Sequence, residues 1–421
     1  MTSSTSANTP SAENHSGISR RRILGGGAVA AGSALAGGVL GHAWSTSTAT
    51  PDSSTPAHSV PLHGHRKEPF HGKHQSGILT GQQAHGSFVG LNLRRGSRRD
   101  DVIALLRMLS DDAARLTQGR PPLGALEDDI AKLPARLTVT FGFGKGLFEA
   151  IGKPDSIPPA LATLPAFDTD RLRPEWGQTD LVLQICSEEP ITLSYARRRL
   201  VRDAAAFATV AWVQTGFGNA PGTEPAGNTP RNLMGMRDGT ANESDPAHSS
   251  AVVWSTDPAY PWLVGGSHLV IRRMSIEMEA WDDIEVAAKE EAFGRRISDG
   301  APLTGKHEKD PVDRLAKNSD GFPVINPAAH AARAQPRNES ERMMRRAYNY
   351  DVGLTPEGKT DVGLIFVCYQ KDVATAFVPV QRRLADSDLL NLWAHHIGSA
   401  SYAVPPGAGT GEYIGQPLLE S

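Results

Sequence analysis

Cysteine is scarce in this 421-residue sequence, and neither sign of charge is in large excess. The two cysteines, Cys186 and Cys368, are too few for the disulfide framework of a small secreted domain. The formal net charge of −3 argues against nucleic acid or an anionic membrane as the main partner, because both favour a basic excess. After residue 50 there is no run of about 18 apolar residues, so we expect no stable membrane span in the body of the chain.

The sequence has the composition of a globular protein. It is 39% hydrophobic and 21% charged, which is ordinary for a chain with a sizeable core. Its length is enough for about two or three domains.

Residues 1–49 have the pattern of an export signal. Arg20 and Arg21 precede a short Gly/Ala-rich run that ends near Leu40, and a small-x-small site follows at residues 41–43. This pattern is typical of a twin-arginine signal, whereas a membrane anchor would need a longer and more apolar run. We therefore expect export by the twin-arginine pathway, to the extracellular space or the cell envelope. That route carries folded proteins, which suggests a cofactor inserted before export.

Residues 50–75 are rich in Ser, Thr and Pro and show no hydrophobic period, so a disordered linker is predicted. A histidine-rich tract of this kind can bind copper or zinc weakly, and copper binding would suit a copper-partnered accessory protein. The alternative is a solvated tail with incidental histidines. The histidines of the linker are His58, His63, His65, His71 and His74.

The body of the chain contains an internal similarity. Residues 180–200 and 361–384 each have an apolar run near a cysteine and an Arg-Arg-Leu further on. Near-continuous apolar runs indicate buried strands, so both cysteines are expected in the core. We predict two halves of one α+β architecture, residues 76–220 and 221–421, each an antiparallel sheet with peripheral helices. Further strands are predicted over residues 135–144 and 267–278, and helices over 100–116 and 198–215.

Two long irregular stretches, residues 216–250 and 300–342, are expected to be functional, since loops of this length are seldom idle. The first contains GMRDGT (residues 235–240), where Asp238 stands beside a glycine. Taken alone, this is the composition of an ordinary solvated turn.

The second stretch contains His330 within NPAAHAARAQPR. Of the six histidines after His85, only His395 and His396 lie close together in the sequence, and on a helix these two would point in different directions, so no zinc site is expected there. One histidine is sufficient when the metal arrives in a macrocycle, as iron does in haem. Small neighbours would let a flat ring approach His330, although a surface histidine is the alternative. No Cys-x-x-Cys-His motif occurs, so covalent haem attachment is excluded.

In combination, NLMGMRDGTAN and NPAAHAARAQPR followed by MMRRAYNYD resemble the dye-decolorizing peroxidase family, in particular its exported group with deferrochelatase-type members. Segments such as LTVTFGFGKGLFEAIG, WVQTGFG and SASYAVPPGAGTGEYIGQPL extend the resemblance over about residues 76–421. The resemblance implies two ferredoxin-like halves, with one non-covalent haem b held in the second half.

The resemblance also implies site residues. His330 would be the axial ligand of the iron, Asp238 the distal acid, and Arg345 the distal cation, with Arg346 as the alternative to Arg345. Asp372 is a weak candidate for the carboxylate that orients His330. Further residues expected at the haem are Gly239, Thr240 and Ala241 along its edge, Gln335, Pro336 and Arg337 on its proximal side, and Arg295 at a propionate.

The implied function is an exported haem b peroxidase that reduces hydrogen peroxide while it oxidises dyes, phenols or another reductant. A haem- or iron-handling protein like the deferrochelatases is the alternative, and a copper-linked accessory protein is a third. Bulky dyes do not fit a buried pocket, so the sequence also suggests that dyes are oxidised at aromatic residues on the surface. Tyr348, Tyr350 and Trp393 are the candidates.

Overall fold

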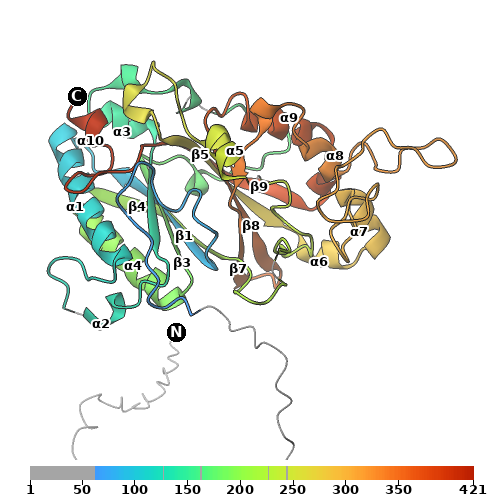
Figure 1. The fold of residues 1–421 in the computed structure, drawn as a ribbon, viewed down its shortest axis with the longest axis horizontal. Coiled ribbons are helices and arrows are strands. Elements are labelled where there is room, and N and C mark those ends of the chain that lie inside the picture. The colour runs from blue at the N-terminus through green and yellow to red at the C-terminus, as the bar shows by residue number, and fades with distance from the viewer. Residues whose placement is uncertain (1–61, 127, 162–163, 226, 243–244) are drawn as a thin grey trace, which may run out of the picture. The chain divides into compact units, whose positions relative to one another are not determined.

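The computed structural model describes residues 62–421 except 127, 162–163, 226 and 243–244. The predicted twin-arginine signal and residues 50–61, with His58, lie outside the described residues. The described chain is mixed α+β (Figure 1). Its strands are β1 His85–Leu93, β2 Thr138–Phe143, β3 Leu181–Ser187, β4 Ala208–Phe217, β5 Ser267–Ile276, β6 Met344–Arg345, β7 Tyr348–Leu354, β8 Thr360–Gln370 and β9 Ala394–Val404.

The strands form one antiparallel sheet in the order β5-β9-β2-β3-β1-β4-β7-β8-β6, with a further pairing of β5 with β8. When the two-residue strand β6 is left out, β2-β3-β1-β4 and β7-β8-β5-β9 repeat the same order within this sheet, counted along the chain of each half as second, third, first and fourth strand. In the described chain the backbones of the two sets pair at Phe143↔Ala403 and at Phe217↔Asn349. The predicted internal similarity therefore corresponds to a repeat of strand order.

Two long helices cover the first set of strands. Helix α1 (Arg99–Thr117) buries Val102, Leu105, Leu106 and Leu109, which recur every three or four residues and so form one face of the helix. Helix α4 (Pro190–Ala204) begins at Glu189, whose side chain accepts a hydrogen bond from the Thr192 backbone. Both helices pack against each other and against the strands beneath them (Figure 1).

The second set of strands has shorter helices. These are α5 (Pro246–Val253), α6 (Met278–Asp282), α7 (Val286–Phe293), α8 (His330–Ala334) and α9 (Phe377–Ser387). In Figure 1 α7, α8 and α9 lie together beyond β8 and β9. The remaining α-helices are α2 (Asp128–Ala131) and α3 (Lys145–Ala150) in the first half and α10 (Gln416–Leu419) at the C-terminus. None of the helices in the described part of the chain is both long and apolar enough to cross a bilayer.

Two predictions about local structure were wrong. The helix predicted over residues 198–215 ends at Ala204, and the rest is β4, in which buried Trp212 and Gln214 alternate with exposed neighbours. That alternation has period 2, which is the period of a half-buried strand. The predicted linker is also folded over its described part. Phe70 is 4% exposed in the core, and the His74 ring stacks on Trp254 at 3.8 Å between centroids.

Both cysteines are fully buried in strands, Cys186 in β3 and Cys368 in β8. Burial raises the pKa of each thiol. Their predicted place in the core is confirmed.

Candidate functional site

A cavity of about 500 Å³ opens in the second half. Its floor is the face of β5 and β8, and α8, α9 and the GMRDGT loop form its walls. This volume is in the usual range for a cofactor or ligand pocket. Apolar side chains line much of it, among them Met234, Met236, Ile276, Phe293, Leu364, Phe366 and Leu384.

The GMRDGT loop folds back on the segment before it. Arg231 and Arg237 form an isolated bridge, and the Asp238 N–H donates to the Pro230 carbonyl at 2.9 Å. Gly239 has φ +119°, a conformation that residues with a side chain rarely adopt. The loop is therefore a built turn at the cavity, and the glycine is needed for its backbone.

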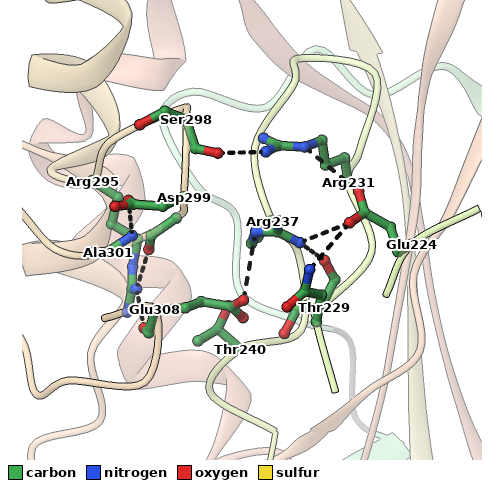
Figure 2. A network of polar contacts seen from close by, with 12 residues as sticks. Glu224, Thr229, Arg231, Arg237, Thr240, Arg295, Ser298, Asp299, Ala301 and Glu308 are labelled. Atoms are coloured by element: carbon green, nitrogen blue, oxygen red, sulfur yellow. Dashed lines mark hydrogen bonds and ion pairs between the residues drawn. The ribbon is translucent and has the colours of Figure 1, made fainter. Parts of the chain in front are cut away.

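One partly buried carboxylate, that of Glu308, holds this loop from both sides of Asp238 (Figure 2). Glu308 accepts a hydrogen bond from the Thr240 hydroxyl at 2.8 Å and lies 3.5 Å from the Arg237 guanidinium. Arg295 donates to the backbone carbonyl of Glu308 at 2.9 Å. This network (Figure 2) ties the loop to the segment around residues 295–310 and places Asp238 at the cavity.

Asp238 and Arg345 face each other across the cavity wall, with carboxylate and guanidinium 3.9 Å apart. Arg345 is the last residue of the two-residue strand β6. The next residue, Arg346, is fully buried on the other side and donates to the Thr80 carbonyl and the Gln83 side chain. Successive side chains of an extended segment point to opposite faces, which accounts for the difference. Of the two arginines, Arg345 is the one that lines the cavity.

His330 lines the same cavity as the first residue of α8. Its Nδ1 is 2.6 Å from the carboxylate of Asp388, which is 4% exposed. Burial lowers the pKa of His330, but the Asp388 carboxylate raises it by more, and the net shift is upward. Because Nδ1 is engaged by Asp388, Nε2 is the ring nitrogen that is free to bind a metal.

The carboxylate that orients His330 is therefore Asp388, and the candidate Asp372 was wrong. Asp372 instead accepts hydrogen bonds from Ala374 and Thr375 in its own turn. Asp388 follows α9 and also caps the next short turn through the Leu390 N–H. Nothing in the sequence separates it from Asp386, the other acid of ADSD (residues 385–388), because only the fold brings Asp388 to His330.

Helices α8 and α9 hold each other through their arginines. Arg333 donates to the Arg383 carbonyl, and Arg383 donates to the Arg333 carbonyl, at 3.0 and 3.2 Å. Arg383 also makes two bonds to the buried carboxylate of Glu341. Bidentate pairs of this kind fix geometry, so the helix that carries His330 is rigidly seated.

The cavity brings together most of the predicted site residues. Arg337 is not among the residues that line it; its backbone N–H binds Glu341. Tyr348 and Tyr350 are fully buried, which contradicts a surface role, and Trp393 packs against Trp281. The predicted residues that line the cavity are Asp238, Gly239, Thr240, Ala241, Arg295, His330, Gln335, Pro336 and Arg345.

The donor set fits haem. Among the described residues no group of three His, Cys, Asp or Glu side chains could hold a bare metal ion. A single available imidazole suffices for iron in a porphyrin, apolar walls suit the ring, and arginines suit its carboxylates. His395 and His396 turn to different partners, Glu277 and Gln381, so they do not form a metal pair.

The cavity thus has one imidazole backed by a carboxylate on one wall and an acid–arginine pair on another. This arrangement defines a haem peroxidase type of site: one ligand for iron, and a proton-transferring group with a cation where peroxide would react.

Comparison with known proteins identifies the family. Residues 75–218 match the N-terminal part of the Dyp-type peroxidases, and residues 229–409 match the C-terminal part. The chain belongs to the Dyp-type peroxidase family and is a haem peroxidase.

Several relatives resemble the chain over most of its length. It is 41% identical over 366 residues to a dye-decolorizing peroxidase of Thermobifida fusca, which covers 82% of this chain and 84% of that protein. It is 35% identical over 426 residues to a deferrochelatase of Shigella flexneri, with 96% and 97% covered.

Solved structures agree with this assignment. A DyP-type peroxidase from Cellulomonas bogoriensis superposes with a TM-score of 0.83 at 45% identity, covering 86% of this chain and all of that one. Ferric DtpA from Streptomyces lividans gives 0.82 at 40% identity, with the same coverage.

Proposed function

We propose that the chain binds one haem b non-covalently, with His330 as the axial ligand, in the second of two ferredoxin-like halves. The observation that carries this proposal is the 2.6 Å contact between His330 and Asp388 on the wall of the 500 Å³ cavity. The repeated strand order supports the two ferredoxin-like halves, since it is the order of a β-α-β-β-α-β unit. The absence of a Cys-x-x-Cys-His motif supports non-covalent binding.

Bound haem would supply the iron that exchanges electrons with hydrogen peroxide. The protein supplies the proton transfer: the Asp238 carboxylate takes a proton from one peroxide oxygen and returns it to the other. The guanidinium of Arg345 stabilises the negative charge that develops as the oxygen–oxygen bond breaks. Their separation of 3.9 Å lets both groups contact one small molecule.

Stopped-flow absorption after mixing with hydrogen peroxide tests these roles. Asp238→Ala should slow the spectral change about 10²–10⁴-fold, the usual contribution of a general acid–base group, and leave haem content unchanged. A loss below about tenfold in Asp238→Ala, beside a severe loss in Arg345→Leu, would show that Arg345 dominates and that Asp238 only shapes the pocket.

A second candidate is the removal of iron from haem, because deferrochelatases of several bacteria are 35–36% identical to this chain over 95% or more of its length. Two measurements separate the candidates: turnover of a dye or phenol with hydrogen peroxide, and the appearance of free porphyrin from added haem. Dye turnover without porphyrin release supports the peroxidase with an external reductant.

We also propose export by the twin-arginine pathway, supported by Arg20 and Arg21 ahead of the Gly/Ala-rich run. A variant with both arginines changed to lysine should remain in the cytoplasm; normal export of that variant would contradict the proposal. Copper binding by the histidine tract gains no support from its described part. His74 is engaged by Trp254 and by the Gly265 carbonyl.

A further inference from the structure

Asn242 binds the backbone of Arg345 through both ends of its side-chain amide. Its Oδ1 accepts from the Arg345 N–H at 3.0 Å, and its Nδ2 donates to the Arg345 carbonyl at 2.7 Å. The two residues are 103 positions apart in the sequence. A side-chain amide that satisfies both backbone groups of one residue acts like a neighbouring strand.

Strand β6 needs such a partner because it is paired on one side only. It is two residues long and pairs with β8, where Arg345 lies opposite Cys368. Arg346 donates to the Val367 carbonyl of β8, so in the alternating antiparallel pattern the backbone groups of Arg345 point the other way. Asn242 occupies that free side.

Asn242 belongs to the same loop as the distal acid. It comes four residues after Asp238, and its own N–H donates to the Gly239 carbonyl at 2.8 Å. One turn therefore carries the carboxylate and also fixes the backbone from which the guanidinium extends. Glu308 in turn ties this loop to the rest of the cavity wall through Thr240 (Figure 2).

We propose that Asn242 is a positioning residue that sets the place of Arg345 relative to Asp238. The inference rests on the proposed role of Arg345 as the distal cation. Without the two hydrogen bonds from the Asn242 amide, the backbone of β6 is paired with β8 alone. The guanidinium of Arg345 then loses its fixed position.

Fluoride binding to the ferric, haem-loaded protein gives a readout that does not depend on turnover. A small anion on the distal side would accept a hydrogen bond from Arg345, so its affinity reports the position of that guanidinium. Asn242→Ala should weaken fluoride binding about tenfold, the loss expected for one to two net hydrogen bonds. Asn242→Asp keeps the acceptor for the Arg345 N–H and loses the donor, so it serves as the second variant if the alanine protein does not fold.

Gln178 provides a matched control. Its side chain makes the same pair of bonds to the backbone of Ser401 in β9, both at 2.9 Å, and it does not line the cavity. Gln178→Ala should lower the melting temperature and leave fluoride affinity unchanged. Equal losses of fluoride affinity in both variants would reduce Asn242 to a general stabilising residue and overturn the inference.

A double-mutant cycle with Arg345→Leu completes the test. If Asn242 acts through Arg345, Asn242→Ala should have no further effect on fluoride affinity in the Arg345→Leu background; additive losses would overturn the inference. If Arg345→Leu strongly weakens fluoride binding while Asn242→Ala leaves it unchanged, only the positioning role of Asn242 is overturned. If Arg345→Leu changes neither the fluoride affinity nor the rate of the peroxide reaction, the proposed role of Arg345 is overturned as well.

Discussion

The two halves of the molecule share one strand order and use it differently. In the first half, the connections after β1 and β3 carry the long helices α1 and α4, which fill the face of the sheet with a continuous apolar core. In the second half, the connection from β5 to β7 spans residues 277–347 and contains short helices and the two-residue strand β6. Together with the GMRDGT loop and α9, this connection encloses the 500 Å³ cavity.

The difference shows that strand order does not decide whether a half binds a cofactor. Long amphipathic helices cover a sheet face, since their apolar side chains must be buried against it. Short helices and loops cover it incompletely, and they can present His330, Asp238 and Arg345 from separate segments. We therefore expect substitutions in the first half to change stability and those in the second half to change haem binding and chemistry.

The largest effect is expected for His330, the proposed ligand of the haem iron. His330→Ala should purify largely without haem, because the described cavity offers one imidazole backed by a buried carboxylate. Asp388→Asn should keep haem but bind it about 10–100-fold more weakly, the usual cost of removing the partner of a ligating histidine. Both are measured by Soret absorbance and by the rate of haem transfer to a competing acceptor.

His307 is an exposed histidine of the same half and provides the control. His307→Ala should retain haem like the unaltered protein. A full Soret band in His330→Ala would exclude His330 as the ligand and would place the iron elsewhere in the cavity.

How much of this could be predicted from the sequence differs between the halves. Apolar runs predicted β2, β3, β5 and β8, and helical spacing predicted α1, because burial imposes those periods locally. The transition from α4 to β4 was missed, since alanine-rich residues between Ala204 and Ala208 fit either structure.

In the site, the family motifs led to His330, Asp238 and Arg345. They did not lead to Asp388 or Glu308, and they assigned no role to Asn242, although it ends the motif NLMGMRDGTAN. These three residues act through contacts between segments distant in the sequence. No local period or spacing encodes such contacts. These partners become visible only when the loops are folded against one another.

Two phenylalanines sharpen the comparison. Phe141 in β2 is fully buried in the first core, whereas Phe293 at the end of α7 lines the cavity and packs edge-on to the His330 ring at 6.2 Å between centroids. Phe141→Ala should lower the free energy of unfolding by about 3–5 kcal/mol and leave the haem affinity of the folded protein unchanged. Phe293→Ala should cost less stability, because its side chain already borders open space, but should speed haem loss.

Chemical denaturation of the haem-free proteins and haem-transfer rates of the loaded proteins measure the two effects separately. If Phe141→Ala speeds haem loss as much as Phe293→Ala does, the halves are energetically coupled and the division of roles fails.

The last effect is limited to part of the pH range and concerns a buried acid inside the well-packed half. Asp112 on α1 is 5% exposed and lies beside Asp203, with Asp111 and Arg199 nearby. Burial, followed by the Asp203 carboxylate, raises the pKa of Asp112 from 3.8 to about 7, and Arg199 offsets part of this shift. The folded protein therefore holds a proton that the unfolded chain releases at lower pH.

A pKa that is raised on folding gives stability that is fully present at low pH and is lost as the pH rises through the folded value. For Asp112 the loss falls between about pH 4 and about pH 7. Asp112→Asn removes this titration and keeps a donor for Asp203, so it should stabilise the protein by on the order of 4 kcal/mol at pH 8 and have little effect at pH 4. The exposed acid Asp100, in the first turn of the same helix, provides the control: Asp100→Asn should give the same small change at both pH values. Melting temperatures at pH 4 and pH 8 measure these changes. If Asp112→Asn raises the melting temperature equally at both pH values, relief of packing strain, and not the loss of the Asp112 titration, is responsible for the stabilisation.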